Sequence, residues 1–147
     1  MTIEEFIEKH EGRRNKPYKC TAGHNTIGVG WNMDANLLPP KIADYLKENG
    51  EITDAMIDQL LRLSIMVAIS DCNALFPSFD DFSDNRRMAL IDFVFQLGKH
   101  RANNFVHAIA AINTGRWEDA ANAMRDSAWF HQVPNRAAEV TELIKNG

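Results

Sequence analysis

The sequence predicts an α+β fold that is mainly helical, with a small β-hairpin lobe and a larger helical lobe. Two short segments with strand character, residues 18–20 and 26–31, flank a turn at residues 23–25. Apolar residues recur at helical spacing along most of the remaining chain. A length of 147 residues and a hydrophobic content of 45% are enough for one domain with its own core.

The first predicted helix begins at the N-terminus, where Thr2 and Glu5 match the spacing of a capping box. Gly12 is expected to end this helix. Glu11 then lies at the helix C-terminus, where the helix dipole disfavours a negative charge and helps to keep a carboxylic acid protonated. One face of the helix is mostly apolar and carries Ile3, Phe6, Ile7 and His10.

The predicted hairpin brings Cys20 and Thr26 close together, because they lie on opposite sides of the turn at residues 23–25. Gly28 and Gly30 then follow in the second strand. Glycine at these positions lets another backbone or a sugar ring approach closely, or it simply allows the strand to bend. The spacing alone does not separate these two interpretations.

We expect a single domain over residues 1–147, in which a connecting helix at residues 53–75 joins the two lobes. A short helix beginning at Pro39-Pro40 ends at Gly50, and Thr53 caps the connecting helix. Within the helix at 84–97, the segment 88–97 is apolar on nearly every face, so it should run through the middle of the helical lobe. The mostly β-containing lobe with the N-terminal helix covers residues 1–52, and the helical lobe covers residues 76–147, with helices at 84–97, 105–112, 116–124 and 134–144.

Composition and charge exclude several function classes. The formal net charge of −4 gives no general attraction to nucleic acid, so we expect no nucleic-acid partner. The apolar stretch at residues 60–69 is too short to span a bilayer, and no secretory signal is visible, so we expect synthesis in the cytoplasm and no stable membrane association. The two cysteines are expected to be free thiols, with Cys72 buried, and no metal-binding motif is present.

The most informative pattern is formed by Glu11, Cys20 and Thr26, in which eight residues separate the acid from the thiol and five separate the thiol from the hydroxyl. This spacing resembles the active-site signature of phage-type lysozymes, in which the middle position is Asp or, less often, Cys. Three further blocks, 86–98, 115–121 and 129–137, follow in the order expected for the T-even phage lysozymes. The resemblance covers most of the chain and is weakest between residues 31 and 83.

The resemblance implies a lysozyme-like fold with the active-site cleft between the two lobes. It implies a muramidase that cuts the β-1,4 bond between N-acetylmuramic acid and N-acetylglucosamine in the glycan strands of peptidoglycan, without a metal or organic cofactor. We expect a monomer that leaves the host cytoplasm through a holin pore and acts on the periplasmic cell wall as an endolysin. A tail-associated or prophage lysozyme would have the same sequence features. The alternative is a cell-wall-binding scaffold that kept the fold and lost efficient catalysis.

Glycoside hydrolysis needs an acid that protonates the leaving oxygen and a second group on the opposite side of the sugar. Glu11 is the candidate acid, and its alternative interpretation is a solvated carboxylate at a helix end. By resemblance, Arg136 is the supporting partner of Glu11 across the cleft floor. Such a partner would favour the ionised carboxylate, against the acid role. Arg136 could instead form a structural ion pair between the first and last helices, and both roles are compatible.

Cys20 has three interpretations. It acts as a thiolate base that activates a water molecule, it attacks the sugar directly as a nucleophile, or it takes no part in catalysis. The base role ranks first, because the lysozymes that the sequence resembles invert the anomeric centre with water. Thr26 is expected to hold that water through its hydroxyl, and its alternative role is that of an ordinary β-branched strand residue.

Three residues are expected to bind the glycan. Phe95 and Gln96 resemble residues that line the cleft in the family, and the Gln96 amide offers donors and acceptors to N-acetyl groups. Phe95 is equally compatible with a place in the core. Asn32, just beyond the hairpin, is expected to face the glycan, whereas Trp117 and Trp129 are expected to serve in packing.

Overall fold

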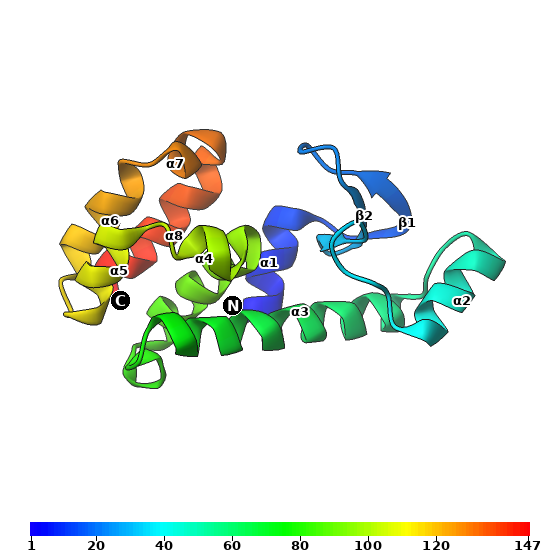
Figure 1. Cartoon of the computed structure of the whole chain (residues 1–147), viewed down its shortest axis with the longest axis horizontal. Coiled ribbons are helices and arrows are strands. Elements are labelled where there is room, and N and C mark those ends of the chain that lie inside the picture. The colour runs from blue at the N-terminus through cyan, green and yellow to red at the C-terminus, as the bar shows by residue number, and fades with distance from the viewer. The chain divides into compact units, whose positions relative to one another are not determined.

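A computed structural model describes all residues from 1 to 147 and confirms the mainly helical α+β fold with one small antiparallel sheet (Figure 1). The chain divides into two compact units, Met1–Ile65 and Met66–Gly147, and the boundary lies inside one long helix. These are called the first and the second unit below. No helix combines the length and the apolar character that a membrane span requires.

The first unit begins with helix α1 (Ile3–Glu11), and the predicted cap is confirmed. The N–H of Glu5 donates to Oγ1 of Thr2 at 3.1 Å, as in a capping box. Gly12 ends the helix with a φ of 77°, and its N–H donates to the carbonyl of Glu8 at 2.8 Å. Glu11 is therefore the last residue of the helix, as predicted.

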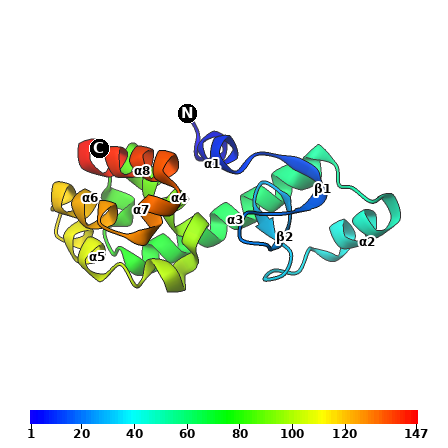
Figure 2. The same cartoon turned by 90° about the horizontal axis from the view of Figure 1, so that it is seen from above.

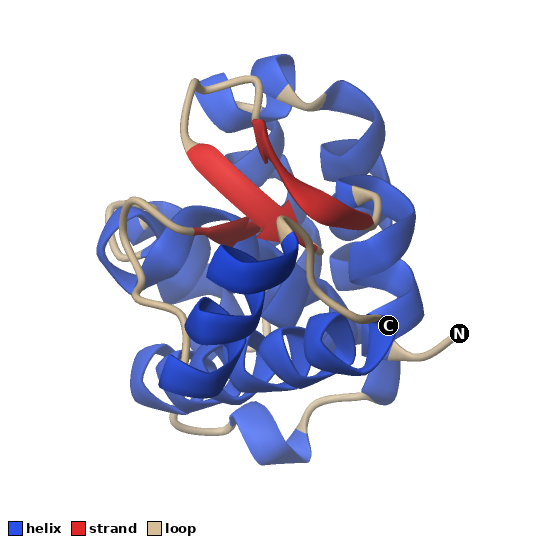
Figure 3. Ribbon diagram, turned by 90° about the vertical axis from the view of Figure 1, so that its right-hand side faces the viewer, coloured by secondary structure: helices blue, strands red, loops and turns tan.

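The sheet contains three antiparallel strands in the order β1-β2-β3 (Figure 3). The predicted hairpin is confirmed, but the segment 26–31, predicted as one strand, is divided into two. Gly28 and Gly30 have φ values of 66° and 70°, and the chain reverses direction between them. Ile27 consequently pairs with Trp31 across the new turn. The strands are β1 (Arg14–Lys19), β2 (Asn25–Gly28) and β3 (Trp31–Asn32).

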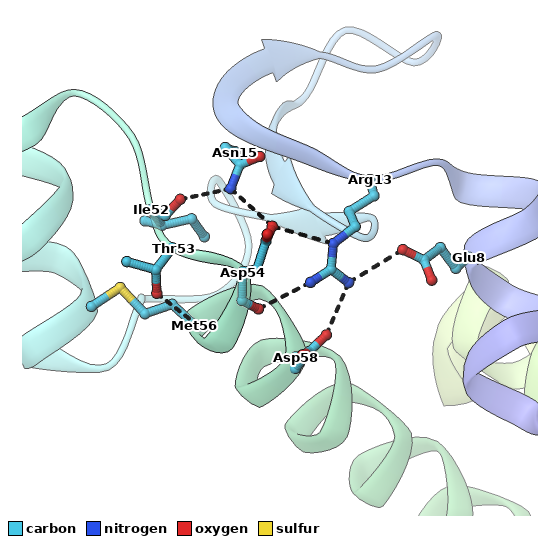
Figure 4. Close-up of polar contacts among 8 residues, drawn as sticks. All are labelled: Glu8, Arg13, Asn15, Ile52, Thr53, Asp54, Met56 and Asp58. Carbon is cyan, nitrogen blue, oxygen red and sulfur yellow. Dashed lines mark hydrogen bonds and ion pairs between the residues drawn. The ribbon is translucent and has the colours of Figure 1, made fainter.

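Arg13 joins the end of α1 to a later part of the first unit (Figure 4). Its Nη1 lies 3.2 Å from Oε1 of Glu8 and 2.9 Å from Oδ1 of Asp58. Its Nη2 donates to the carbonyl of Asp54 at 3.0 Å. The next strand is tied to the same place, since Nδ2 of Asn15 donates to the carbonyl of Ile52 at 2.8 Å. These contacts hold the chain immediately after Glu11 and so restrict where the Glu11 side chain can lie.

Helices α2 (Pro40–Asn49) and α3 (Asp54–Leu75) begin and end where local signals predicted. Gly50 follows α2 with a φ of 73°, and its N–H donates to the last turn of that helix. Oγ1 of Thr53 accepts a hydrogen bond from the N–H of Met56 at 3.2 Å and so caps α3.

The second unit is entirely helical beyond α3 (Figure 2). Helix α8 packs against both α4 and α6, and α5 packs against α6. A short 3-10 helix, Phe79–Asp81, and helix α7 were not predicted, because each is shorter than two turns and leaves no periodic pattern. The helices are α4 (Asp84–Ala102), α5 (Val106–Asn113), α6 (Trp117–Arg125), α7 (Ala128–Gln132) and α8 (Pro134–Asn146).

Helix α4 carries much of the core of the second unit, as its apolar composition predicted. Leu90, Phe93 and Val94 are at most 2% exposed. The prediction ended this helix at residue 97, whereas the structure continues it to Ala102 with a break at Gly98, where φ is 78° and ψ is 158°. The predicted end therefore coincides with a real interruption, after which the chain resumes its helical path.

Candidate active site

Glu11 lies against the backbone of Gly30 within the first unit. A Cβ atom added to Gly30 would lie 2.8 Å from Oε2 of Glu11, closer than such atoms approach each other. Gly30 also has a positive φ of 70°, so two independent features favour glycine here. A close approach was one of two interpretations of these glycines, but the group that approaches Gly30 is a carboxylate and not a backbone or a sugar ring, and it belongs to a side chain that is only partly exposed.

Cys20 and Thr26 lie on opposite sides of the turn between β1 and β2. The strands pair Tyr18 with Thr26, and the N–H of Cys20 donates to the carbonyl of His24 at 3.0 Å. The N–H of Gly23 donates back to the carbonyl of Cys20 at 2.8 Å. The same carbonyl of His24 also accepts from Oγ1 of Thr26 at 2.9 Å. One turn therefore positions both side chains.

The peptide groups of this turn act on the Cys20 sulfur. They hold the pKa of the thiol below its usual value, and the largest cause is a hydrogen bond from the backbone N–H of His24. Desolvation opposes this effect, whereas further hydrogen bonds from the backbones of Ala22 and Gly23 and from the side chain of Thr26 lower the pKa again. A lowered pKa increases the fraction of thiolate, which is the basic and nucleophilic form.

Thr26 is only 3% exposed, and its single hydroxyl proton has two acceptors within reach. One is the carbonyl of His24 and the other is the sulfur of Cys20. When Cys20 is ionised, the hydroxyl can turn toward the sulfur and stabilise the negative charge. The hydroxyl of Thr26 is thus placed beside the thiol by the fold and not merely by strand propensity.

Glu11 and Cys20 both influence the pKa of the Tyr18 side chain. Burial raises the pKa of the Tyr18 phenol, and the charges of Glu11 and Cys20 raise it further, whereas Arg14 lowers it. The guanidinium carbon of Arg14 lies 4.6 Å from the centre of the Tyr18 ring. The candidate acid and the candidate base are therefore both within electrostatic range of one side chain of the same unit.

Asn32, predicted to face the glycan, uses its carbonyl oxygen inside the protein. Oδ1 accepts hydrogen bonds from the N–H of Asp34 at 2.9 Å and from the N–H of Ala35 at 3.1 Å. Any contact between Asn32 and a sugar must therefore use the amide nitrogen. This turn-forming role of Asn32 was not predicted from the sequence.

In the second unit, Gln96 is bound to a tryptophan. Nε1 of Trp129 donates to Oε1 of Gln96 at 3.0 Å, and Trp129 is 3% exposed. Its indole packs edge-on against Phe93, with ring centres 5.0 Å apart. Trp129 therefore has the packing position that was expected, and it also orients the Gln96 amide. Phe95 is partly exposed, so neither of its two interpretations is eliminated.

A pocket of about 590 Å³ lies within the second unit, a volume typical of ligand sites. Phe105 and Trp129 form part of its apolar wall. Polar and charged groups from α5 and from the segment before α7 complete it, and no sequence pattern predicted this grouping because the residues come from separate parts of the chain. These groups include His107, Asp126 and Ser127.

Arg136 forms a buried, bidentate ion pair with Asp92. Nε donates to Oδ2 at 3.0 Å and Nη2 donates to Oδ1 at 2.7 Å. The two side chains are 8% and 0% exposed. Asp92 was not predicted as a site residue, because it is one polar residue within the apolar segment of α4. Glu11 lies in the first unit and Arg136 in the second, and the pairing of these two remains a prediction.

Comparisons with known proteins agree on one family. The family model described as "Phage lysozyme" matches residues 8–143. The chain is 29% identical over 161 residues to "Probable T4-type lysozyme 1" of Dictyostelium discoideum, covering 99% of this chain and 95% of that protein. It is 26% identical to the pre-baseplate central spike protein Gp5 of Enterobacteria phage T4, covering all of this chain and 28% of the spike protein. It is 24% identical to the peptidoglycan hydrolase gp36 of Pseudomonas phage phiKMV, covering 89% of this chain and 14% of gp36.

Proposed function

The chain belongs to the phage lysozyme family and is a lysozyme-type glycoside hydrolase, and from this premise we propose that it cleaves the β-1,4 bond between N-acetylmuramic acid and N-acetylglucosamine in peptidoglycan. The observation that supports this most is the grouping of Glu11, Cys20 and Thr26 within the first unit. The Glu11 carboxyl lies against the backbone of Gly30, and one hairpin turn holds the Cys20 thiol and the Thr26 hydroxyl close together. An acid and a base are the two groups that glycoside hydrolysis requires.

Glu11 is the proposed general acid. It gives its proton to the glycosidic oxygen while the bond from that oxygen to the anomeric carbon breaks. Pairing with Arg136 would favour the ionised carboxylate, and in that case we propose that substrate binding and the loss of water around the carboxyl restore the proton.

Cys20 is the proposed general base, acting as a thiolate. It takes a proton from a water molecule whose oxygen forms the new bond to the anomeric carbon, on the face opposite the leaving group. The electron pair of the broken bond stays with the leaving oxygen, which receives the Glu11 proton. The product then has inverted stereochemistry. Direct attack by sulfur would instead form a glycosyl-thioether with inversion, and water would then displace the sulfur with a second inversion, so that the product retains the stereochemistry.

The remaining residues are proposed to hold water and glycan. Thr26 positions the attacking water, since its hydroxyl lies beside the Cys20 sulfur. Gln96 presents its amide NH₂ group to N-acetyl groups, because its oxygen is already bound to Trp129. Phe95 offers a partly exposed aromatic ring for contact with the sugar, and Asn32 offers its amide nitrogen.

We propose host-cell lysis as the biological role, with a monomer acting on the periplasmic cell wall after release through a holin pore. No metal or organic cofactor is required by this mechanism, and neither nucleic acid nor a membrane is a partner. One of the related proteins is a phage spike protein, so a lysozyme that acts during entry is the alternative setting for the same chemistry.

The deciding experiment measures the clearing of a bacterial suspension and identifies the new ends of the cleaved glycan strands. The purified protein is added to Gram-negative cells with a permeabilised outer membrane, and turbidity is followed. The released glycan is then reduced with borohydride. Muramitol as the new end group supports cleavage after N-acetylmuramic acid, whereas glucosaminitol would assign the other glycosidic bond and overturn the proposed specificity.

A wall-binding scaffold is the second candidate, because Cys20 replaces the more frequent Asp and the net charge is −4. Such a protein would sediment with purified cell walls but would neither clear the suspension nor release new reducing ends. Binding together with release of reducing ends would exclude it.

A further inference from the structure

The turn that carries Cys20 is clamped by a carboxylate from beyond β3. Oδ2 of Asp34 accepts a hydrogen bond from the backbone N–H of Asn25 at 2.9 Å. Oδ1 of Asp34 accepts another from the side-chain Nδ2 of Asn25 at 3.0 Å. The N–H of Met33 donates to the carbonyl of Asn25 at 2.8 Å. Residues 33 and 34 therefore bind the backbone of Asn25 on both sides and its side chain as well.

Asp34 is itself held in place. Its N–H donates to Oδ1 of Asn32 at 2.9 Å, which fixes the start of the loop after β3. Asn32 pairs with Thr26 across β2 and β3. We call these contacts of Asn32, Asp34 and Asn25 the clamp. It begins at Asn32, which pairs with Thr26, and it ends at Asn25, the residue immediately before Thr26.

Asn25 lies between His24 and Thr26, the two residues that hydrogen-bond within the turn beside Cys20. The His24 carbonyl accepts from both the N–H of Cys20 and the hydroxyl of Thr26. Rotation of the peptide around Asn25 would move this carbonyl and would turn away the N–H groups that face the sulfur. We propose that Asp34 is a positioning residue for hydrolysis, which locks the turn so that its peptide N–H groups face Cys20 and its carbonyl holds Thr26. The consequence for catalysis rests on the proposed base role of Cys20.

Positioning and simple charge repulsion have opposite consequences for Cys20. Removal of the negative charge of Asp34 alone would favour the thiolate and lower the thiol pKa. Loss of the aligned N–H groups would disfavour the thiolate and raise the pKa. Nδ1 of His24 lies 3.8 Å from Oδ2 of Asp34, so the imidazole is the nearest counter-charge when protonated. The other charged or titratable groups acting on this region, unchanged in the test, are Lys19, Tyr18, Glu11 and Arg14.

The test measures the pH dependence of Cys20 alkylation by iodoacetamide in Asp34→Ala. We expect the thiol pKa to rise by about one unit, which lowers the alkylation rate near pH 7 about tenfold. Cys72 does not interfere, because burial raises its pKa to about 12. Asp44→Asn, at an exposed carboxylate on α2, is the matched control for the loss of one negative charge and should leave the rate unchanged.

A rescue variant separates positioning from general loss of structure. In Asn25→Asp/Asp34→Asn the amide and the carboxylate exchange places. The new amide oxygen accepts the backbone N–H, and the new amide NH₂ donates to the new carboxylate. This variant should restore the alkylation profile and kcat, while Asp34→Ala lowers kcat several-fold with little change in KM. Asp34→Leu, which keeps a similar side-chain size but has no acceptor, is used if Asp34→Ala does not fold.

The outcomes are distinguishable. A thiol pKa that is unchanged or lowered in Asp34→Ala, or in Asp34→Leu if Asp34→Ala does not fold, overturns the positioning role, whatever the activity of the parent protein. A raised thiol pKa with rescue by the exchange, accompanied by a lower kcat, supports it. A raised thiol pKa with unchanged kcat would overturn the role in hydrolysis and would also remove Cys20 from the proposed mechanism.

Discussion

The two units hold their candidate residues by different means. In the first unit, Cys20 and Thr26 are placed by backbone hydrogen bonds of one turn. In the second unit, Gln96 and Arg136 are placed by other side chains, Trp129 and Asp92. A backbone-held group can be replaced without leaving an unsatisfied partner, whereas removal of Arg136 leaves a buried charge. Substitutions should therefore alter chemistry in the first unit and stability in the second.

The two cysteines show the same contrast for one residue type. Cys20 lies at the turn of the first unit, and hydrogen bonds lower its pKa. Cys72 lies on α3 in the second unit, where it is fully buried and its pKa is raised to about 12. Environment alone thus makes one thiol a candidate base and the other an inert core residue.

The largest effect is expected for Glu11→Gln. The amide cannot donate a proton to the leaving oxygen, so clearing should fall by about 10²–10⁴-fold. The melting temperature should stay close to that of the parent, because the side chain keeps its shape. Glu48→Gln, at an exposed position on α2, is the matched control. Clearing by Glu11→Gln at nearly the parent rate would remove Glu11 from the acid role.

Substitutions of Cys20 test whether the thiol takes part in the reaction. Cys20→Asp should keep strong activity, because a carboxylate can also accept the proton of water, whereas Cys20→Ala should lose about 10²-fold or more. Thiol alkylation should inactivate the parent and spare Cys20→Asp. Undiminished clearing by Cys20→Ala would show that the thiol is not needed.

The pH profile of the same variants gives an independent check. The thiolate is present above the pKa of Cys20 and is lost as the pH falls through it. Hydrogen bonding lowers that pKa, so the activity of the parent should begin to rise below the pH at which an ordinary thiol ionises. An ordinary thiol ionises about four units above a carboxylate, so the rising limb of Cys20→Asp should be displaced to more acidic pH. If activity rose over the same pH range in the parent protein and in Cys20→Asp, this would contradict a base role for position 20.

Arg136→Ala tests the second unit, where we expect a loss of stability. Asp92 is fully buried, and an uncompensated buried charge costs about 3–5 kcal/mol. For a chain of this size that corresponds to a fall in the melting temperature of roughly 10 °C. Arg125→Ala breaks the more exposed pair with Glu142 and should cost about 0–1 kcal/mol. Both pairs lie in the second unit, so equal melting temperatures for the two variants would show that the buried pair stabilises this unit no more than an exposed pair does.

Local signals predicted most of the fold. Thr2, Gly50 and Thr53 mark helix ends through bonds to residues at most four positions away, and such bonds can be recognised in the sequence. Gly28 and Gly30 were ambiguous, because glycine suits both a bent strand and a chain reversal. The spacing of the candidate acid, thiol and hydroxyl likewise lies within one short segment.

Contacts between distant residues could not be predicted in the same way. Asp92 and Arg136 are 44 residues apart, and Gln96 and Trp129 are 33 residues apart. Each pair forms only because the helices of the second unit pack together, and a lone polar residue in an apolar segment does not indicate its partner. Even the clamp from Asp34 to Asn25 depends on the chain reversal that the strand pattern concealed.

The smallest effect is expected for Trp129→Phe, which removes one hydrogen bond and keeps an aromatic ring. The phenyl ring can still pack against Phe93, so the loss should be that of the bond to Gln96, about 1 kcal/mol. The freed Gln96 amide should bind glycan less well if its orientation matters, which would raise KM and leave kcat nearly unchanged. Trp117→Phe is the matched control, since its ring packs on Phe82 away from Gln96. A lower kcat without a change in KM would show that Trp129 affects the reacting groups themselves and would weaken the division between a chemical first unit and a supporting second one.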